Sequence, residues 1–305
     1  MNYIFSNILG TFILDENTAI VDSILFKTIE EYKHKEKSET KLQQKHNAKP
    51  LPKEKLLQAL LLFKDAKYYQ DFYQKNIELT KEGLKNAVNE DNLIIQAIAN
   101  INELDKISNT MTKRLREWYS LYYPELSEEI ENHEKYVELV LEQERKSESF
   151  GADLSESDLE EMKLLAGRIT SLYALRKQHE LYLEKIMTKY CPNMLELAGA
   201  TIAARLIELG KGLKHLALLP ASTIQLLGAE KALFRHLKTG SRSPKYGVII
   251  NHPLIQNAPR DKKGKAARML ADKLSLCARL DYFKGEFKAP DYKKELEGKL
   301  HQEKP

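Results

Sequence analysis

The chain has 305 residues, of which 42% are hydrophobic and 30% are charged, and this length is typical of about two domains. Such proportions are typical of a globular protein with a large polar surface. They favour separated helices over a single compact sphere. The sequence contains no run of 18 or more apolar residues, so we expect no membrane-spanning helix and no membrane partner.

The net charge of +4 hides an uneven distribution. Residues 199–288 contain 17 Lys and Arg against 6 Asp and Glu, a balance of +11. The segment after them is neutral, with four residues of each sign, so residues 1–198 stand at −7. A basic block joined to an acidic one predicts that a polyanion binds at one end of the chain only.

The cysteines and the N-terminus both favour a cytoplasmic protein. Cys191 and Cys277 form no C-x-x-C pair, which indicates a reduced protein with both thiols as ordinary core or surface residues. The N-terminus has no basic segment, and Asn7 and Gly10 interrupt its apolar part, so we expect no signal peptide.

The first part of the chain has the pattern of strands. Two apolar runs, at 3–14 and 19–26, are rich in β-branched residues and flank a plausible turn at 15–18. A lone hairpin is marginal in water, so it must pack on a helix or on a partner. Residues 33–53 are highly charged and show no apolar periodicity, and we predict a linker or loose loop there.

From Pro52 the pattern becomes helical, with amphipathic stretches at 56–63 and 68–84. Two long apolar seams follow, each with a mean spacing near 3.5 residues, which is the period of a supercoiled helix. The first seam is Ile94, Ile98, Ile101, Leu104, Ile107, Met111, Leu115, Trp118 and Tyr122. The second is Leu159, Met162, Leu165, Ile169, Leu172, Leu175, His179, Tyr182, Ile186 and Tyr190.

The two seams predict an antiparallel coiled-coil arm, on the order of 45 Å long at 1.5 Å per residue. We expect Pro124 to end the first helix, residues 126–146 to form a shorter acidic helix, and Ser155 or Ser157 to cap the second. An arm this long buries little of itself. Four helices from two chains would bury both seams, so we predict a homodimer through this arm.

Pro192 opens a C-terminal helical block. Pro220 suits a helix start, with Ser222 and Thr223 able to cap it, and Gly228 is expected to break that helix. Residues 229–237 form the next helix in this interpretation. Its cations, with Lys238 just beyond, fall at spacings of four and three and therefore share one face: Lys231, Arg235 and Lys238.

The remainder of the block offers weaker signals. Residues 246–250 form a short buried run that passes for a strand, although the family named below places it in a helix. A last long helix is expected at 264–283. Beyond Lys288 the chain is polar, and we expect a frayed tail.

The sequence GAEKALFR at 228–235 follows PASTIQLL and precedes SPKYG and NHPLI. This stretch closely resembles the Nop domain of the box C/D ribonucleoprotein core proteins, and the chain is similar to the archaeal member that pairs with fibrillarin. LIIQAI and KRLREWYSLYYPEL, on the first seam, resemble the dimer arm of that family. The resemblance covers about residues 72–283, more than half of the chain.

The resemblance implies a mainly α fold: a small α+β N-terminal domain, a long antiparallel coiled-coil arm and an all-helical C-terminal Nop domain. The corresponding segments are 1–90 for fibrillarin binding with a linker, 91–190 for dimerisation, 191–288 for RNA and protein binding, and 289–305 for a polar tail.

The resemblance also assigns roles to individual residues. Lys231 and Arg235 would contact phosphate, and Leu233 and Phe234 would form the apolar edge that limits the guide–substrate duplex. Glu230 would hold Lys231 or a basic residue of the partner protein. Further members of this interface with guide RNA and the kink-turn-binding protein are Gly228, Ala229, Ala232 and His252.

Basic residues extend the surface, and we expect these also to bind RNA: Lys238, Arg242, Lys245, Lys263, Lys265 and Arg268. Each assignment has a structural alternative. A charge run is often only a solvated face, and GAEK alone is compatible with an ordinary helix junction. His252 either contacts a base or the kink-turn protein, or it is a packed, capping histidine.

We find no Gly-rich phosphate loop, no H-E-x-x-H, no metal-spaced cysteines and no nucleophile elbow in the sequence. The function that the resemblance implies is a non-catalytic scaffold, without catalytic or metal-binding residues, that bridges fibrillarin to a box C/D guide RNA bound by the ribosomal-type kink-turn protein. The expected location is the archaeal cytoplasm. The chain would need no cofactor, because S-adenosylmethionine belongs to fibrillarin. The alternatives are a Nop protein of another kink-turn particle without a methyltransferase, and an unidentified enzyme.

Overall fold

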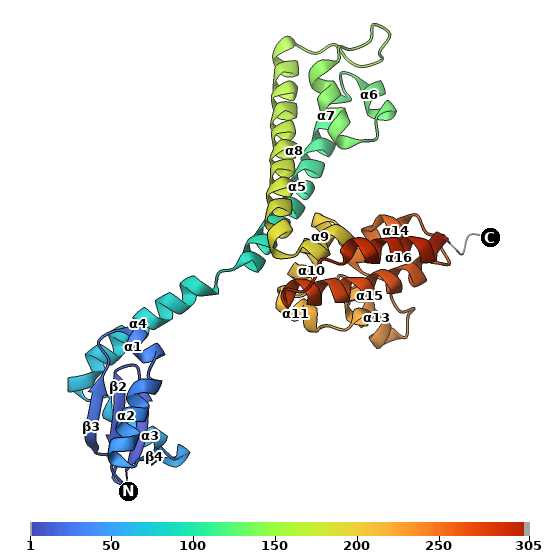
Figure 1. Ribbon diagram of the computed structural model, residues 1–305. Coiled ribbons are helices and arrows are strands. Elements are labelled where there is room, and N and C mark those ends of the chain that lie inside the picture. The colour runs from blue at the N-terminus through green and yellow to red at the C-terminus, as the bar shows by residue number, and fades with distance from the viewer. Residues whose placement is uncertain (1, 302–305) are drawn as a thin grey trace. The chain divides into compact units, whose positions relative to one another are not determined.

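The computed structural model describes residues 2–301, and the chain divides into two compact units, 1–88 and 89–305. Helices dominate both units, and one small sheet lies near the N-terminus (Figure 1). The predicted mainly α class with a small α+β N-terminal part is therefore confirmed. Residues 302–305 of the expected polar tail lie outside the described part of the chain.

The sheet of the first unit has four strands: β1 (Tyr3–Asn7), β2 (Gly10–Leu14), β3 (Ile20–Leu25) and β4 (Lys49–Pro50). Their order is β3-β2-β1-β4. The pairs β1–β2 and β2–β3 are antiparallel, whereas β4 pairs with β1 in parallel. Strand β2 lies in the interior of the sheet, and all five of its residues are buried.

The first apolar run forms two strands where one was expected. Ile8 and Leu9 make the turn between them, and the side-chain oxygen of Asn7 accepts a hydrogen bond from the backbone N–H of Leu9 at 2.9 Å. The prediction missed this turn because its two residues are apolar and buried, unlike the Gly, Asn and Asp residues that usually mark hairpin turns.

The expected loop at 33–53 is wrong. After the short helix α1 (Ile29–Lys33), helix α2 (Glu36–His46) covers one face of the sheet. It buries Leu42, which packs in one cluster with Ile13 of β2. A helix that buries a single residue shows no apolar periodicity, although Glu, Lys and Gln are good helix formers.

Helices α3 (Lys53–Leu62) and α4 (Ala66–Ala87) follow, as the pattern predicted. Phe63 at the end of α3 lies 4.9 Å from Phe12 of β2 between ring centroids. Ala59 and Phe63 therefore build a second cluster with β2, separate from the one that α2 makes.

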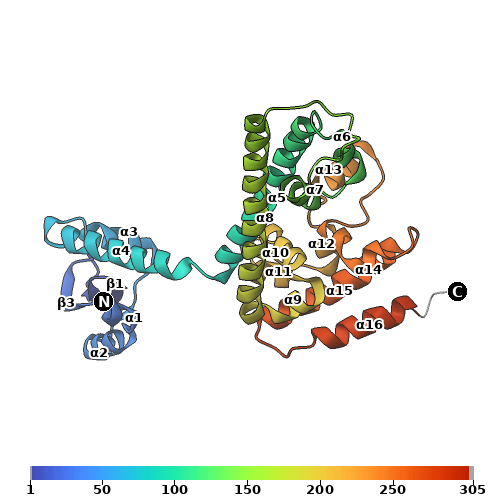
Figure 2. The ribbon, with the colours of Figure 1, turned by 90° about the horizontal axis from the view of Figure 1, so that it is seen from above.

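The second unit begins with α5 (Glu90–Tyr119), which lies side by side with α8 (Glu156–Tyr190) and forms the long arm (Figures 1 and 2). Ser155 caps α8 as expected, because its side chain accepts a hydrogen bond from the backbone N–H of Asp158. The expected acidic helix at 126–146 consists of two, α6 (Pro124–Glu129) and α7 (His133–Glu142).

Pro124 begins α6 and does not end α5, which stops earlier at Tyr119. The break between α6 and α7 is stabilised by Asn132, whose side chain accepts a hydrogen bond from the backbone N–H of Lys135 at 3.0 Å. An N-cap within an acidic stretch starts a new helix, and the charge pattern alone did not reveal it.

The interior of the arm departs from the predicted seams at its middle. Ser108 and Thr112 of α5 are fully buried, whereas the seam residue Ile107 is 48% exposed. Asp105 and Arg176 form an ion pair across the two helices at 2.5 Å. The predicted seam takes three gaps of three residues in succession, which rotates it off the contact line that alternating gaps of four and three would follow.

Two hydrophobic cores flank this polar middle. One unites the beginning of α5 and the end of α8 with the C-terminal block. The other lies at the tip, where α5, α6, α7 and α8 meet.

The C-terminal block consists of short helices around a long one (Figures 1 and 2). In chain order they are α9 (Pro192–Ala198), α10 (Ala200–Leu209), α11 (Leu213–Leu218), α12 (Ala221–Leu226), α13 (Glu230–Thr239), η1 (Val248–Asn251), α14 (Pro253–Gln256), α15 (Lys263–Tyr282) and α16 (Ala289–His301). The short run at 246–250 lies partly in the 3-10 helix η1 and is no strand. Helix α15 packs against α9, α11 and α12 and forms the centre of the core.

The expected frayed tail is wrong for the described residues, because α16 is a docked helix. Ala289 and Leu296 are buried in the main core. The backbone N–H of Ala289 donates to the side-chain oxygen of Asn193 at 3.0 Å, and Lys273 pairs with Glu295 at 2.6 Å. Two buried apolar residues hold α16 within an otherwise polar sequence. Across residues 2–301, every helix is too short or too polar to cross a lipid bilayer.

Candidate nucleic-acid interface

The junction between α12 and α13 requires glycine at position 228. Gly228 has a φ of +88°, and a Cβ built on it would lie 2.4 Å from a methyl carbon of Val248. The backbone N–H of Val248 donates to the carbonyl of Leu227 at 2.8 Å. The predicted break is therefore confirmed, and its position is fixed by close packing against η1.

The side chains that cap the helices at this junction differ from those expected. Pro220 itself stands at the N-cap of α12 and no side chain caps that helix, so the expected caps by Ser222 and Thr223 are wrong. A carboxylate oxygen of Glu230 accepts a hydrogen bond from the backbone N–H of Gly228 at 2.7 Å. Glu230 thus stabilises the start of α13 from within the chain.

None of the residues of helix α13 is buried, and most of its side chains are exposed to solvent. Lys231, Arg235 and Lys238 are exposed and share the expected face. Phe234 is 66% exposed and Leu237 is 71% exposed. A helix with both a cationic face and uncovered apolar side chains is suited to a partner that combines phosphate with an apolar surface.

The other expected residues of the GAEKALFR stretch lie around the same helix. Ala229 is half-buried at its N-cap, and its carbonyl accepts a hydrogen bond from the N–H of Leu233 at 2.9 Å. Leu233 is half-buried, whereas Ala232 is exposed. Only part of the apolar edge is therefore free for contact.

The loop after α13 is anchored through its backbone while its cations stay exposed. Gly240 ends the helix at a φ of +67°, and a ring nitrogen of His236 contacts the carbonyl of Ser241. The side-chain amide of Gln225 donates to the carbonyl of Lys245 at 2.6 Å. The side chains of Arg242 and Lys245 project from this fixed backbone into solvent.

The fold brings a second basic group to this loop. The side chain of Lys245 lies 3.5 Å from where a Cβ of Gly264, in the first turn of α15, would stand. Lys265 and Arg268 of α15 are exposed and Lys263 is half-buried. Cations from two distant parts of the sequence therefore gather at one place, and their summed field favours a polyanion.

His252 is buried and caps α14, and the structure therefore does not favour a contact of this side chain with RNA or a partner protein. Its Nδ1 accepts a hydrogen bond from the backbone N–H of Leu254 at 3.2 Å, and its Nε2 lies 2.9 Å from the carbonyl oxygen of Leu197. Burial lowers the pKa of the imidazole, which keeps the ring neutral. Of the two readings left open by the sequence, the capping histidine is the one observed.

A pocket of about 440 Å³ lies at the base of the arm. Its walls include Ile98, Asn102 and Val248, together with the first turn of α10. Arg205 lines it but pairs with Glu208 at 2.6 Å. The pocket therefore offers no unbalanced positive charge, and no sequence motif marks it.

The thiols are unsuited to nucleophilic chemistry. Cys191 and Cys277 are both buried, and burial raises the pKa of Cys277 to about 12 and that of Cys191 further. A thiol with so high a pKa stays protonated at neutral pH. Within residues 2–301, no group of three His, Cys, Asp or Glu side chains is placed to hold a metal ion.

Comparison with known proteins supports the resemblance seen in the sequence. The Nop family model, described as "snoRNA binding domain, fibrillarin", matches residues 100–150 and 142–302. An uncharacterised NOP5 family protein of Methanocaldococcus jannaschii is 41% identical over 263 residues, covering 77% of this chain and 63% of that protein. Nucleolar protein 56 of Schizosaccharomyces pombe is 40% identical over 222 residues, covering 63% of this chain and 45% of that protein.

Among solved structures, a crystal structure of a fibrillarin/Nop5p complex contains a chain that is similar to this one. The TM-score is 0.48 at 25% sequence identity, with 98% of this chain and 100% of that chain covered. The chain spans between 45% and 63% of the length of the two curated relatives above. Because the family model matches well over half of the sequence, the chain belongs to the Nop family.

Proposed function

We propose that this chain is a non-catalytic scaffold of an archaeal box C/D ribonucleoprotein, acting in the cytoplasm, that guides 2′-O-methylation of RNA. One observation carries the proposal: the α12–α13 junction, the following loop and the start of α15 form a fixed, exposed basic surface on a Nop-family chain. The related proteins are nucleolar protein 56 and NOP5 family members, and the matching family model is described as snoRNA-binding.

The basic surface is proposed to bind the guide RNA. Lys231, Arg235 and Lys238 on α13 neutralise backbone phosphates, and the loop and α15 cations extend the contact. The exposed Phe234 and Leu237 meet apolar partners, either a base pair at the end of the duplex or the kink-turn-binding protein.

The first unit is proposed to bind fibrillarin, the partner named with Nop5p in the similar crystal structure. Helix α3 turns one apolar face to the sheet and a second, exposed apolar face to solvent. The exposed fractions on that outer face are 42% for Leu56, 70% for Leu57, 40% for Leu60 and 49% for Leu61. Four neighbouring exposed leucines on one helix form an apolar patch of the kind that marks protein interfaces.

The arm is proposed to dimerise through the apolar side chains that its own interior leaves outside. Ile107 is 48% exposed on α5, and Leu175 and Tyr182 are 41% and 45% exposed on α8. Ile107 and Leu175 lie in the middle of the arm, where the contact between the helices is polar, and Tyr182 lies further along α8 beside the buried Leu183. A second copy would bury these residues in a four-helix bundle.

In this proposal the scaffold acts through geometry. The arm sets the distance between the guide RNA and the methyltransferase, so that a chosen 2′-hydroxyl reaches the methyl donor. The catalytic residues and S-adenosylmethionine belong to fibrillarin, and this chain supplies neither.

A reconstitution tests the proposal. Full-length chain, fibrillarin, the kink-turn protein, a box C/D guide RNA and a target RNA are mixed with methyl-labelled S-adenosylmethionine. Guide-directed label transfer should require the chain and should be lost with Leu57→Glu/Leu61→Glu, while Leu84→Glu, at a 65% exposed leucine on α4, should retain it.

The same mixture separates the alternatives. RNA binding without any fibrillarin binding would indicate a Nop protein of another kink-turn particle. Turnover of a substrate by the chain alone would indicate an enzyme. Full methylation without the chain would overturn the scaffold proposal.

A further inference from the structure

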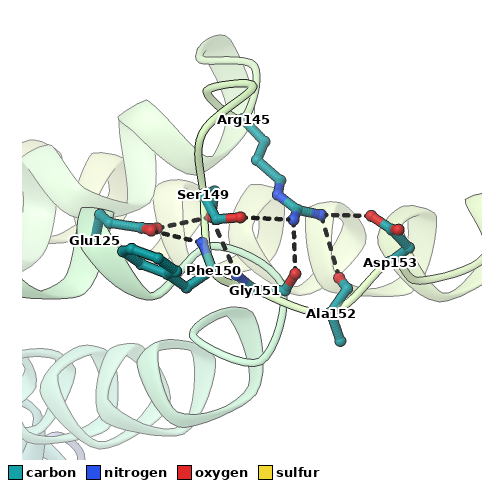
Figure 3. Close-up of polar contacts among 7 residues, drawn as sticks. All are labelled: Glu125, Arg145, Ser149, Phe150, Gly151, Ala152 and Asp153. Atoms are coloured by element: carbon teal, nitrogen blue, oxygen red, sulfur yellow. Dashed lines mark hydrogen bonds and ion pairs between the residues drawn. The ribbon is translucent and has the colours of Figure 1, made fainter.

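A loop at the tip of the arm, residues 143–155 between α7 and α8, holds one aromatic side chain in solvent. Phe150 is 93% exposed, more than any other large hydrophobic residue described. Yet side chains of Arg145 and Glu125 form hydrogen bonds with the backbone around it (Figure 3). This combination, a fixed loop with a free aromatic ring, is unexplained by the packing of the arm.

Arg145 fixes the loop from the inside. Its guanidinium donates to the carbonyls of Ser149 at 3.2 Å, Gly151 at 2.6 Å and Ala152 at 3.3 Å. It also pairs with Asp153 at 2.9 Å. Only 16% of the Arg145 side chain is exposed, whereas that of Asp153 is fully exposed, so the guanidinium is covered by the loop backbone that it binds.

Glu125, at the start of α6, fixes the loop from the other side. Its carboxylate accepts hydrogen bonds from the hydroxyl of Ser149 at 2.7 Å and from the backbone N–H of Phe150 at 2.8 Å (Figure 3). The Phe150 N–H holds the pKa of this carboxyl below its ordinary value. The backbone of Phe150 is thereby held in place while its ring points away.

The loop also contacts the short segment between α5 and α6. The N–H of Ala152 donates to the carbonyl of Leu121 at 2.8 Å, and a Cβ on Gly151 would lie only 1.8 Å from the carbonyl oxygen of Tyr122. Leu121 is itself 58% exposed. Phe150 and Leu121 therefore present two uncovered apolar side chains from neighbouring backbone segments.

The energetic consequence is that the ordering of this loop precedes any binding. Aromatic side chains dominate the affinity of protein interfaces, and a partner gains more from a ring on a fixed backbone than from one on a mobile loop. Within the chain, the exposed ring of Phe150 contributes little burial of its own. The loop is thus better explained as a contact site for a partner than as packing.

The charge around the loop selects the partner. Residues 124–161 contain 14 Asp and Glu against 3 Lys and Arg, a balance of −11. Arg145 donates its hydrogen bonds to the loop backbone, and Lys146 pairs with Glu129 at 2.9 Å. Glu144 and Glu148 of the same loop are exposed. A nucleic acid is repelled here, whereas a cationic polypeptide is attracted.

We propose that the arm tip is a docking site for a lysine- and arginine-rich polypeptide segment of another protein, which places an apolar side chain against Phe150 and Leu121. The site stands apart from the basic surface and does not depend on the proposed RNA function. It gives the two ends of the second unit partners of opposite charge.

The test uses the full-length chain and two fluorescein-labelled short peptides rich in lysine and glycine, one with a central leucine and one with serine in its place. Fluorescence anisotropy measures affinity at low and high salt. The leucine peptide should bind about tenfold tighter than the serine peptide, and this preference should vanish in Phe150→Ser. Glu144→Lys/Glu148→Lys should weaken both peptides.

Matched variants keep the result interpretable. Phe287→Ser removes a 56% exposed phenylalanine elsewhere, and Glu78→Lys reverses an exposed charge in the first unit, so both should bind like the parent. Equal affinity of parent and Phe150→Ser for the leucine peptide would overturn the proposal. So would a loss of guide-RNA binding or of self-association in Phe150→Ser, because either would assign the tip to RNA or to a second copy.

Discussion

Asp91, in the first turn of α5, accepts a hydrogen bond from the backbone N–H of Leu213 at the start of α11, with 3.0 Å between the two atoms. The same carboxylate interacts with the hydroxyl of Tyr190 at the end of α8, where burial and then Asp91 raise the pKa of the tyrosine. One side chain therefore joins both helices of the arm to the C-terminal block. This contact fixes the root of the arm.

Replacing Asp91 should loosen that root. Asp91→Ala leaves the Leu213 N–H without its acceptor and should lower the free energy of unfolding by about 1–3 kcal/mol. Asp91→Asn keeps an acceptor oxygen and should cost less. Urea denaturation of the full chain measures both. Glu103→Ala, which removes an exposed ion pair with Lys106, should change stability by less than about 0.5 kcal/mol, and a similar loss in both variants would contradict the assignment.

Two glycines in the arm should respond to alanine in opposite ways. In Gly151→Ala the new Cβ clashes with the Tyr122 carbonyl, so the tip loop must shift and its amides should lose protection from hydrogen exchange. Gly167, in α8, has nothing within 4 Å of its Cβ position, and Gly167→Ala should stabilise the chain by about 0.5–1 kcal/mol. Unchanged exchange at Phe150 and Ala152 in Gly151→Ala would show that the loop is not fixed as described.

Stability should fall on mild acidification because of His252. Its pKa is lowered by burial from the ordinary 6.5, so the unfolded chain takes up the proton first and unfolding is favoured as the pH falls below about 6.5. Protonation of Nδ1 also breaks the bond to the Leu254 N–H. The contribution of this one proton cannot exceed about 1.4 kcal/mol per pH unit.

The variant His252→Asn isolates this effect. It cannot titrate, so its loss of unfolding free energy between pH 7 and pH 5 should be smaller than that of the parent, even though it starts less stable without the contact to Leu197. Parallel curves for the parent and His252→Asn would remove His252 as the titrating group.

The basic surface predicts a salt dependence. If Lys231 and Arg235 each neutralise one phosphate, Lys231→Ala and Arg235→Ala should each flatten the slope of log affinity against log salt by about one unit. Affinity for guide RNA with the kink-turn protein is measured over a salt series. Lys185→Ala, at an exposed lysine of the arm, serves as the control and should leave the slope unchanged. An unaltered slope in both α13 variants would move the RNA to another face.

Self-association should depend on the outer face of the arm. Ile107→Glu/Leu175→Glu places two charges where a second copy is proposed to pack, and sedimentation velocity should show a dimer for the parent and a monomer for the variant. Leu218→Glu, at a 66% exposed leucine of the C-terminal block, is the control and should remain dimeric. A monomeric parent at micromolar concentration would contradict the dimer.

Local patterns predicted much of the helical framework and part of the candidate site. The spacing of Lys231, Arg235 and Lys238 fixes a shared face as soon as the segment is helical, because side-chain direction follows from the helix period alone. The Ser155 cap is equally local, since it depends on a hydrogen bond from the backbone N–H of Asp158 in the same turn. The break at Gly228 is visible in the sequence, but it is packing against Val248 of η1 that requires glycine there.

Other features of the fold were decided by residues far apart in the sequence. Helices α2 and α16 look like loop and tail because each buries only one or two apolar residues, and what they dock against is formed elsewhere in the chain. The arm's polar interior is likewise a matter of which positions face each other. Two helices in contact select positions by geometry, and Ser108 and Thr112 are enclosed although Ile107 is more apolar.

By itself, the sequence determined the family, because the GAEKALFR stretch and its neighbours resemble it closely. Composition and short-range spacing determined the mainly helical class and the gathering of positive charge beyond residue 198. Only the tertiary structure decided that His252 is enclosed, that Lys245 meets the start of α15, and that Phe150 stands free on a fixed loop. Burial, and hydrogen bonds between residues distant in the sequence, depend on atoms that meet only after folding. No local sequence pattern predicts them.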